Sequence, residues 1–315
     1  MTTPATKTSI LLTGANGSLG TYTALQIAKH HPISHHLILA ARNPTDVNSK
    51  NLTALLDALG NGVTYAFFAL DLASLASTRA FVAELRSQLE TGVIPPLHAI
   101  INCAARVAFT PEPYTVDGFH PIYQINYLAP WVLTTGLVGN LVEGKGMVVN
   151  VTSSARGMGG VGYFDDEGIA KGEPGEVTKE EGSLGGLTTY GSAKLMMAHP
   201  GKTPPSIILF DPGTISSVSR ASTHKPLLLR LIIHMVSTIA PIARLLGTRS
   251  LFHDVEVPAN ALCKLVCEAE LGGGRTGLWY LGDEIVGGKE EVGEEDARRC
   301  WERTVGVLGM EEMSV

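Results

Sequence analysis

The sequence predicts an α/β fold, a doubly wound parallel sheet within a single domain. Short apolar segments alternate with helical segments from the N-terminus onward, which is typical of a parallel sheet covered on both faces. A glycine-rich turn follows the first apolar segment and opens the first helical one. The chain has 315 residues, of which 44% are hydrophobic and 17% charged, so one domain over residues 1–315 can bury a large core.

The first third of the chain alternates strictly between strands and helices. The first two strands are continuous apolar runs, as expected for strands buried on both faces, and the third is rich in aromatic residues. The third helix has clear amphipathic spacing. The strands are expected at residues 9–13, 36–41 and 63–70, and the helices at residues 19–30, 52–59 and 75–89.

The rest of the chain continues the alternation but adds irregular segments. A long helix is expected between two further strands, followed by a glycine- and acid-rich segment that we interpret as a substrate loop. An apolar stretch at residues 227–246 contains two arginines, a histidine and a proline, so we expect a helical lid and no membrane-spanning helix. Contact with a membrane surface remains open. The expected ranges are strands 97–102, 147–152, 206–210 and, as the last, 277–281, helix 117–141, substrate loop 155–187 and lid 220–250.

The net charge and the composition of the N-terminal residues argue against several classes of protein. A net charge of −6 and a pI near 5.9 give no reason to expect a nucleic acid partner. The first eight residues are polar and lead straight into a strand, without the features of a signal peptide. We therefore expect a cytoplasmic protein with reduced cysteines.

No metal site is expected from the cysteines and histidines. Cys263 and Cys267 lie one helical turn apart, but the sequence offers no second pair of ligands nearby. The histidine pairs at residues 30–31 and 35–36 are expected where a helix ends and a strand begins, without further function.

The glycine-rich turn, Thr13-Gly-Ala-Asn-Gly-Ser-Leu-Gly20, predicts a dinucleotide-binding Rossmann fold. Gly14 permits the tight turn, while Gly17 and Gly20 allow close approach of a pyrophosphate and close packing of helix on strand. The positive end of the helix dipole then faces the phosphates.

Arg42 predicts the type of nicotinamide cofactor. An acidic residue at the end of the second strand would accept hydrogen bonds from the ribose 2′-hydroxyl of NAD. Arg42 stands there instead and offers a guanidinium fork to a 2′-phosphate, which favours NADP(H). A solvated arginine at a strand end is the alternative.

Tyr190 and Lys194 form a candidate catalytic pair. Four residues apart on a helix, their side chains share one face. A free tyrosine has a pKa of about 10, and a neighbouring ammonium stabilises the phenolate. The pair can therefore act as a general acid or base near neutral pH.

Several further motifs occur in an order that resembles the short-chain dehydrogenase/reductase superfamily. Asp71-Leu72 resembles the pair that holds the adenine, and Asn102-Cys-Ala-Ala105 a modified form of the family's Asn-Asn-Ala-Gly. Asn126 matches the helix asparagine of the catalytic tetrad, and Asp211-Pro-Gly-Thr214 the turn that borders the nicotinamide. Ser154 ends the run Val-Thr-Ser-Ser and matches the catalytic serine. The resemblance covers about residues 9–280 and is greatest to retinol-dehydrogenase-like members and to reductases of fungal secondary metabolism.

The resemblance implies the roles of the catalytic residues. Tyr190 would donate a proton to a carbonyl oxygen while NADPH delivers hydride to the carbon, and Ser154 would hydrogen-bond the same oxygen. Ser153 is a near-equal candidate for the serine. Lys194 would bind the nicotinamide ribose, and Asn126 would hold a water that links Lys194 to solvent. Contacts with the cofactor are implied for Gly14, Asn16, Gly17, Ser18, Leu19, Gly20, Arg42, Asp71, Leu72, Asn102, Ala104, Tyr190, Lys194, Pro212, Gly213 and Thr214.

Pro130 gives the role of Asn126 a basis in covalent structure. Proline has no N–H, so in a helix the carbonyl of Asn126 loses its usual partner and is free to accept from water. A proline that kinks the helix for packing is the alternative.

The chain departs from the family directly after Lys194. His199-Pro200-Gly201 and Pro204-Pro205 must stop a helix that the family continues for several turns. A genuine deletion or an incorrectly spliced gene would both produce this pattern. Because that helix packs against a partner subunit in the family, the family's dimer is not carried over.

Two other functions remain open from the sequence. The spacing of the glycine turn and the long gap between Ser154 and Tyr190 also fit a nucleotide-sugar epimerase or dehydratase. The shortened helix after Lys194 fits a cofactor-binding protein without redox turnover. We expect an oxidoreductase that acts on a ketone or aldehyde and the corresponding alcohol of a small, hydrophobic substrate.

Overall fold

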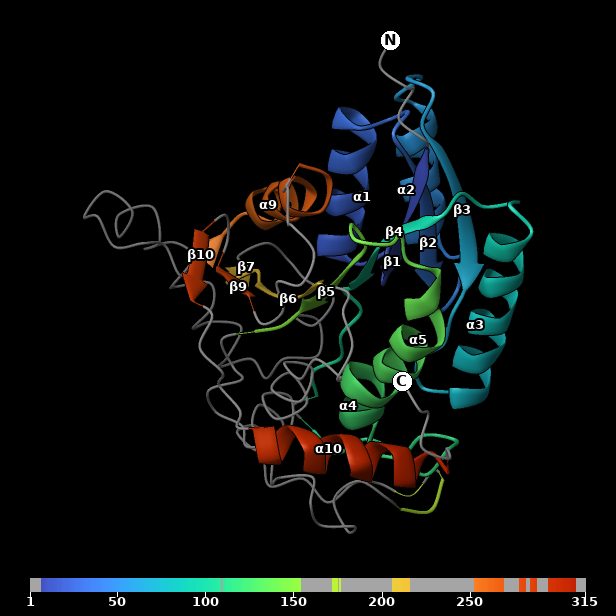
Figure 1. Ribbon diagram of the computed structural model, residues 1–315, viewed down its shortest axis with the longest axis vertical. Coiled ribbons are helices and arrows are strands. Elements are labelled where there is room, and N and C mark those ends of the chain that lie inside the picture. Colours follow the sequence, from blue (N-terminus) through green and yellow to red (C-terminus); the bar gives the residue numbers. More distant parts are fainter. Residues whose placement is uncertain are drawn as a thin grey trace.

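The computed structural model describes residues 7–108, 110–153, 172–174, 176, 206–215, 252–268, 278–281, 284–287 and 294–309. In this part of the chain, eight strands form one twisted sheet in the order β10-β9-β6-β5-β4-β1-β2-β3 (Figure 1). Strands from β3 to β9 in that order run parallel, and β10 alone is antiparallel to its neighbour. The bounds are β1 Thr8–Thr13, β2 His35–Ala41, β3 Thr64–Ala69, β4 Leu97–Asn102, β5 Met147–Val151, β6 Ser206–Asp211, β9 Leu278–Leu281 and β10 Glu284–Gly287.

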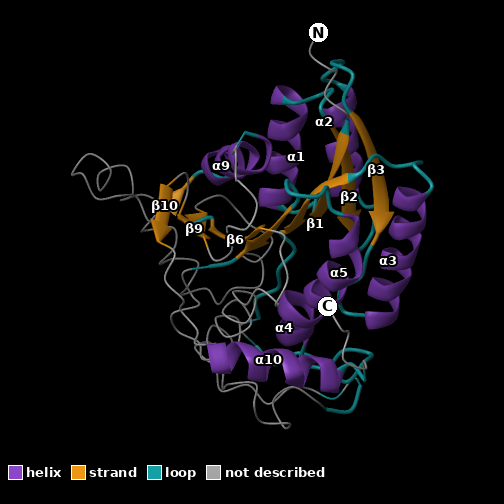
Figure 2. Ribbon diagram, viewed as in Figure 1, coloured by secondary structure: helices purple, strands orange, loops and turns teal. Residues whose placement is uncertain are grey.

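Helices cover both faces of the sheet, as Figure 2 shows. Residues alternate along each strand between two buried clusters, because successive side chains point to opposite faces. Leu12 and Leu39 pack against one set of helices, and Leu11 and Ile38 against the other. The first set is α1 Ser18–His30, α2 Val47–Asp57 and α9 Glu256–Cys267; the second is α3 Leu75–Glu90, α4 Pro121–Tyr123 and α5 Ala129–Leu137, with α10 Glu294–Val307 at its end. The predicted doubly wound sheet is confirmed.

Helix α2 begins earlier than the expected residue 52. The carboxylate of Asp46 accepts a hydrogen bond from the backbone N–H of Ser49 at 2.7 Å and caps the helix from Val47. Apolar spacing does not indicate this start, because the spacing begins only at Leu52.

The expected long helix at residues 117–141 is wrong at both ends and in its middle. It begins at Pro121, after the ring of His120 accepts from the N–H of Ile122 at 3.2 Å, and α5 ends at Leu137. Between them lies a π-helix, η1, at Gln124–Leu128, and a 3₁₀ turn, η2, follows at Val138–Asn140. Pro130 lies two residues beyond the end of η1, and its missing N–H accounts for the local change of hydrogen-bond spacing.

The C-terminal part contains elements that the periodicity did not predict. The strand expected at residues 277–281 is not the last, because β10 turns back from β9 as an antiparallel edge strand. A short parallel pair, β7 Thr214–Ile215 and β8 Phe252–His253, lies outside the main sheet. Helices α9 and α10 were not assigned from the sequence.

Helix α10 lies across the end of the molecule next to α4 (Figure 1). The hydroxyl of Tyr127, fully buried, shares a hydrogen bond of 2.7 Å with Thr304 and lies 3.3 Å from the sulfur of Cys300. The rings of Trp131 and Trp301 pack with centroids 4.9 Å apart. The C-terminal helix therefore completes the core around η1.

Two predicted segments fall wholly or largely outside the described residues. The substrate loop 155–187 is described only at 172–174 and 176, where Gly172 donates to Gly118 and Tyr114 donates to Glu176 through backbone bonds of 2.8 Å. The lid at 220–250 lies outside the described residues altogether. Among the helices that are described, none is both long enough and apolar enough to cross a bilayer.

His120 makes the stability of the fold depend on pH. Burial lowers the pKa of this histidine from 6.5 to about 4, with Glu112 acting weakly in the opposite direction. The unfolded chain therefore binds the proton first, and stability is lost as pH falls from about 6.5 toward 4. Replacing His120 by Asn keeps a capping acceptor that does not titrate.

Between pH 7 and 4.5, we expect the free energy of unfolding of the native protein, measured with urea, to fall by up to about 3 kcal/mol more than that of His120→Asn. His30→Asn, at an exposed histidine on α1, serves as the control and should follow the native protein. Equal pH dependence of His120→Asn and the native protein would show that His120 does not carry this effect.

Candidate functional site

The predicted site residues that the structure describes gather at the carboxyl edge of the sheet. Strands β1 and β4 are neighbours there, although the chain leaves them toward opposite halves of the sheet. Ligands of open α/β sheets bind in the crevice at this change of direction. The turn after β1 and the loop after β4 form its two sides.

The glycine turn has the geometry that the sequence predicts. Gly14 has a φ of +65°, and a Cβ there would lie 2.8 Å from the Cα of Ala104 after β4. A Cβ on Gly20 would lie 2.3 Å from the carbonyl oxygen of Gly14. Gly14 and Gly20 therefore bring strand, turn and helix into contacts that no other residue allows. Gly17 is less crowded: a Cβ there would meet only the carbonyl oxygen of Gly14, at 3.1 Å.

The start of α1 is suited to an anion. Gly17 is its N-cap and supplies no side-chain acceptor, and the first turn contains no acidic residue. The amide groups of the first turn, from Ser18 to Gly20, therefore lack a capping side chain. Leu19 is buried, so of this residue the backbone is what a ligand could reach. This arrangement fits a pyrophosphate group.

Thr13 joins the two sides of the crevice and was missed as a site residue. Its buried hydroxyl accepts hydrogen bonds of 3.1 Å from the backbone N–H groups of Cys103 and Ala104. Its place directly before the first glycine was the available signal. The bonds fix the loop after β4 against the turn that Gly14 makes.

Asn16 links the turn to helix α2. Its amide donates to both carboxylate oxygens of Asp46, at 3.1 and 3.3 Å, and to the hydroxyl of Ser49 at 2.9 Å. Ser49 in turn donates to the carbonyl of Asn43 at 2.9 Å. Arg42 is exposed directly after the end of β2 and precedes Asn43. The bonds of Asn16 and Ser49 therefore hold the segment that carries Arg42.

Asp71 and Leu72 follow the end of β3. One carboxylate oxygen of Asp71 accepts from the N–H of Ala73 at 3.0 Å, which shapes the turn into α3. Leu72 is 6% exposed and belongs to the core. The pair lies at the carboxyl edge of the sheet, where the cofactor is expected, and its contact with adenine stays a prediction.

Asn102 acts inside the sheet. It is 2% exposed and lies opposite Asn150 in the register of β4 and β5. Its amide donates to Asn150 at 2.8 Å and to the hydroxyl of Thr134 at 3.1 Å. Its own oxygen is buried without a hydrogen-bond partner among the described residues. The side chain therefore fixes the ends of two strands.

Asn126 is fully buried within the π-helix η1 and clamps one residue of the loop after β4. Its amide oxygen accepts from the N–H of Arg106 at 2.9 Å, and its amide nitrogen donates to the Arg106 carbonyl at 2.7 Å. Both ends of the side chain are thus engaged by backbone. The water that Asn126 is predicted to hold would therefore have to bind the backbone carbonyl of this residue.

Arg106 is held from a second direction. Its guanidinium forms a two-pronged ion pair with Glu112, with one bond of 2.6 Å from Nε to Oε2 and another from Nη2 to Oε1. The loop that borders the crevice is therefore anchored at both backbone and side chain.

The turn after β6 and the end of β5 carry further predicted residues at the same edge of the sheet. Gly213 has a φ of 67°, and its backbone N–H donates to the carboxylate of Asp211 at 2.9 Å. The side chain of Asp211 therefore closes the turn after β6. Pro212 is buried within it, and Thr214 begins β7. Ser153 follows the end of β5. Ser154, Tyr190 and Lys194 lie outside the described residues, so their predicted catalytic roles stay predictions.

A groove elsewhere on the described surface does not coincide with this site. It has a volume of about 530 Å³ and lies between α3 and α5, where Arg79, Val82 and Gly136 contribute to its lining. It contains none of the predicted site residues.

Comparison with known proteins gives consistent matches. Residues 8–164 match the family model for short chain dehydrogenases. The chain is 25% identical to short-chain dehydrogenase iccH of Talaromyces variabilis over an alignment 342 positions long, which covers 93% of each chain. It is 32% identical over 160 residues to human retinol dehydrogenase 13, covering 50% of this chain and 44% of that protein.

Among solved structures, the NADPH-bound carbonyl reductase from chicken fatty liver superposes with a TM-score of 0.58. The two chains share 14% identity, and the match covers 90% of this chain and all of the reductase. At this identity the likeness concerns the fold.

The packing of Gly20 leads to a test of the turn. Gly20→Ala places a methyl group against the Gly14 carbonyl, and we expect a loss of about 1–3 kcal/mol in unfolding free energy. Gly306→Ala is the control, because its Cβ would meet open space on α10, and it should stabilise by about 0.5–1 kcal/mol. Chemical denaturation measures both changes. Equal stability of Gly20→Ala and the native protein would contradict the observed crowding.

Proposed function

The chain belongs to the short-chain dehydrogenase/reductase superfamily, and on this basis we propose that it is an NADP(H)-dependent oxidoreductase that interconverts a ketone or aldehyde and an alcohol. The proposal rests on the turn at the β1–β4 crevice, where Gly14 packs against Ala104 and the N-terminus of α1 has no side-chain cap. This arrangement suits a dinucleotide pyrophosphate.

NADP(H) is proposed over NAD(H) because of Arg42. The residue is exposed at the end of β2, next to the strand that carries the glycine turn. The carboxylate of Asp46, the nearest acidic side chain along the chain, is engaged by Asn16 and by the N–H of Ser49. A carboxylate so engaged is a poor acceptor for a ribose hydroxyl, whereas the guanidinium can bind a 2′-phosphate. The chicken reductase of similar fold binds NADPH, in keeping with this choice.

The proposed reaction uses the predicted catalytic residues in distinct roles. NADPH, when bound, supplies a hydride to the carbonyl carbon. Tyr190 donates the proton to the carbonyl oxygen, and Ser154 holds that oxygen by a hydrogen bond. Lys194 keeps the phenol acidic, and Asn126 holds the loop of Arg106 in place beside the crevice.

A hydrophobic substrate is proposed from the apolar stretch at residues 227–246. The similarity to a retinol dehydrogenase supports an apolar alcohol or carbonyl compound, and the similarity to fungal iccH over nearly the whole chain supports a role in fungal secondary metabolism. Oxidation of NADPH by a panel of carbonyl compounds, followed at the nicotinamide absorbance, tests the reaction type. Product formed without net NADPH consumption would indicate an epimerase or dehydratase instead.

Tyr190→Phe tests the proton donor. Without the hydroxyl the carbonyl oxygen has no acid, and we expect kcat to fall at least about 100-fold while NADPH binding changes little. Tyr65→Phe, on the edge strand β3, is the control and should keep full turnover. An unchanged kcat for Tyr190→Phe would remove this residue from the mechanism.

Arg42→Ala tests the cofactor choice. Loss of a charge-assisted contact with the 2′-phosphate should weaken NADPH binding about 10- to 100-fold and leave NADH binding nearly unchanged. Arg298→Ala, at an exposed arginine on α10, is the control. Calorimetric titration gives both dissociation constants, and equal weakening of the two cofactors would show that Arg42 does not bind the phosphate.

A further inference from the structure

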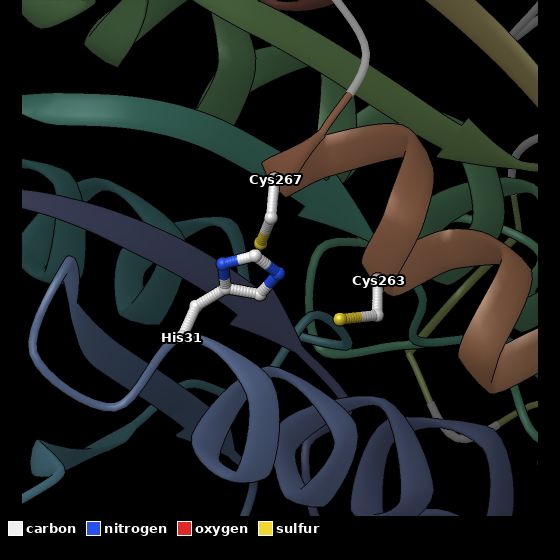
Figure 3. A group of neighbouring side chains, drawn as sticks. All are labelled: His31, Cys263 and Cys267. Atoms are coloured by element: carbon white, nitrogen blue, oxygen red, sulfur yellow. The ribbon is translucent and has the colours of Figure 1, made fainter.

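The fold brings one histidine next to the two cysteines of α9. His31 is the C-cap residue of α1, and Cys263 and Cys267 lie in the last turns of α9, which packs beside α1. One ligand atom from each of the three residues lies within 4.8 Å of the other two. Figure 3 shows the imidazole between the two sulfur atoms.

The spacing of these atoms is close to that of a tetrahedral zinc site. Zinc binds sulfur at about 2.3 Å and nitrogen at about 2.0 Å, so neighbouring ligand atoms lie about 3.5–3.8 Å apart. The observed limit of 4.8 Å requires a movement of about 1 Å, which side-chain rotation can supply. Cys263 and Cys267, four residues apart, present their sulfurs on one face of α9. We propose that His31, Cys263 and Cys267 bind a structural zinc ion.

The nitrogen of His31 gives an independent indication of a ligand. Its Nε2 is buried and has no hydrogen-bond partner among the described residues. Buried polar atoms are normally paired, and an orphan of this kind needs an explanation such as an ion. The carboxylate of Glu268 lies 3.5 Å from the same nitrogen and is half exposed. Because Glu268 is not among the three side chains whose ligand atoms lie within 4.8 Å of one another, its carboxylate would have to rotate toward the sulfur atoms to become the fourth ligand.

The surroundings favour a cation. Helix α1 ends at His31 and helix α9 at Glu268, so the negative ends of two helix dipoles meet at the cluster. The Nε2 of His98 donates a hydrogen bond of 2.9 Å to the carbonyl oxygen of Val266, which braces the last turn of α9. Its ring stacks on His35, with centroids 5.3 Å apart. The last turn of α9, which carries Cys267, is therefore held by His98 of β4.

The position of the cluster indicates a structural role. Helix α1 has 13 residues and leads from the glycine turn at one end to His31 at the other, which places the cluster about 20 Å from the crevice. With His31, Cys263, Cys267 and Glu268 as ligands, a zinc ion would have four protein ligands and no open position for a substrate. It would fasten α9, which is far from α1 in the sequence, to the first helix of the fold.

Metal uptake by the full-length protein tests the site. Reduced, metal-free protein should bind one zinc ion per chain in competition with a chromophoric chelator, and zinc should raise the melting temperature by about 5 °C. Cobalt in place of zinc should give the absorption of thiolate-to-cobalt charge transfer, which reports sulfur ligation directly. His31→Ala and Cys267→Ser should each weaken zinc at least about 100-fold and abolish this absorption.

Two matched controls separate the cluster from general effects. His30→Ala removes the exposed neighbour of His31, and Cys103→Ser removes a cysteine after β4 that is not in a disulfide; both should bind zinc as the native protein does. Cobalt binding by the native protein keeps the test decisive if a variant fails to fold. Less than one zinc per chain, cobalt binding without the charge-transfer absorption, or undiminished binding by His31→Ala would overturn the proposal.

Discussion

The contact between the turn after β1 and the loop after β4 is the constraint on which the rest of the site depends. Gly14 and Ala104 touch through their backbones, and Thr13 holds the same loop with its hydroxyl. A larger residue at Gly14 would separate the two strand ends and open the crevice between them. The N-terminus of α1, which follows the turn, is aimed by the same contact. One close approach thus sets the place where phosphate groups would bind.

Asparagine side chains do much of the work that a regular backbone does elsewhere. Asn126 pairs with both backbone groups of Arg106, Asn102 joins the ends of β4 and β5, and Asn16 joins the glycine turn to α2. Each amide has a donor and an acceptor, so it can satisfy irregular backbone that has left the sheet. The loops around the crevice are ordered by these side chains rather than by strand pairing.

Much of the sheet could be predicted because each parallel strand is a short apolar run between turns. The glycine turn could be predicted because few sequences meet its steric demands. The early start of α2 and the π-helix at η1 depend on the single residues Asp46 and Pro130, to which a search for periodicity is blind. Asn126 was found through the family resemblance, but its contact with Arg106 depends on a loop whose path only the fold determines.

The grouping of His31 with Cys263 and Cys267 could not be predicted for a related reason. The sequence separates them by most of the chain, and the absence of a second cysteine pair argued against a metal. Only the packing of α9 on α1 brings them together. Ser154, Tyr190 and Lys194 remain sequence-based assignments, and their chemistry rests on the family to which the chain belongs.

The docking of α10 has a consequence for how the protein is made. Tyr127 and Trp131, on the helical segment that carries Asn126, complete their packing with Thr304 and Trp301 near the end of the chain. During synthesis the N-terminal strands and helices emerge first and can begin to pair. The apolar surface around Tyr127 stays uncovered until α10 has also left the ribosome, because its partner Thr304 lies 177 positions further along the chain.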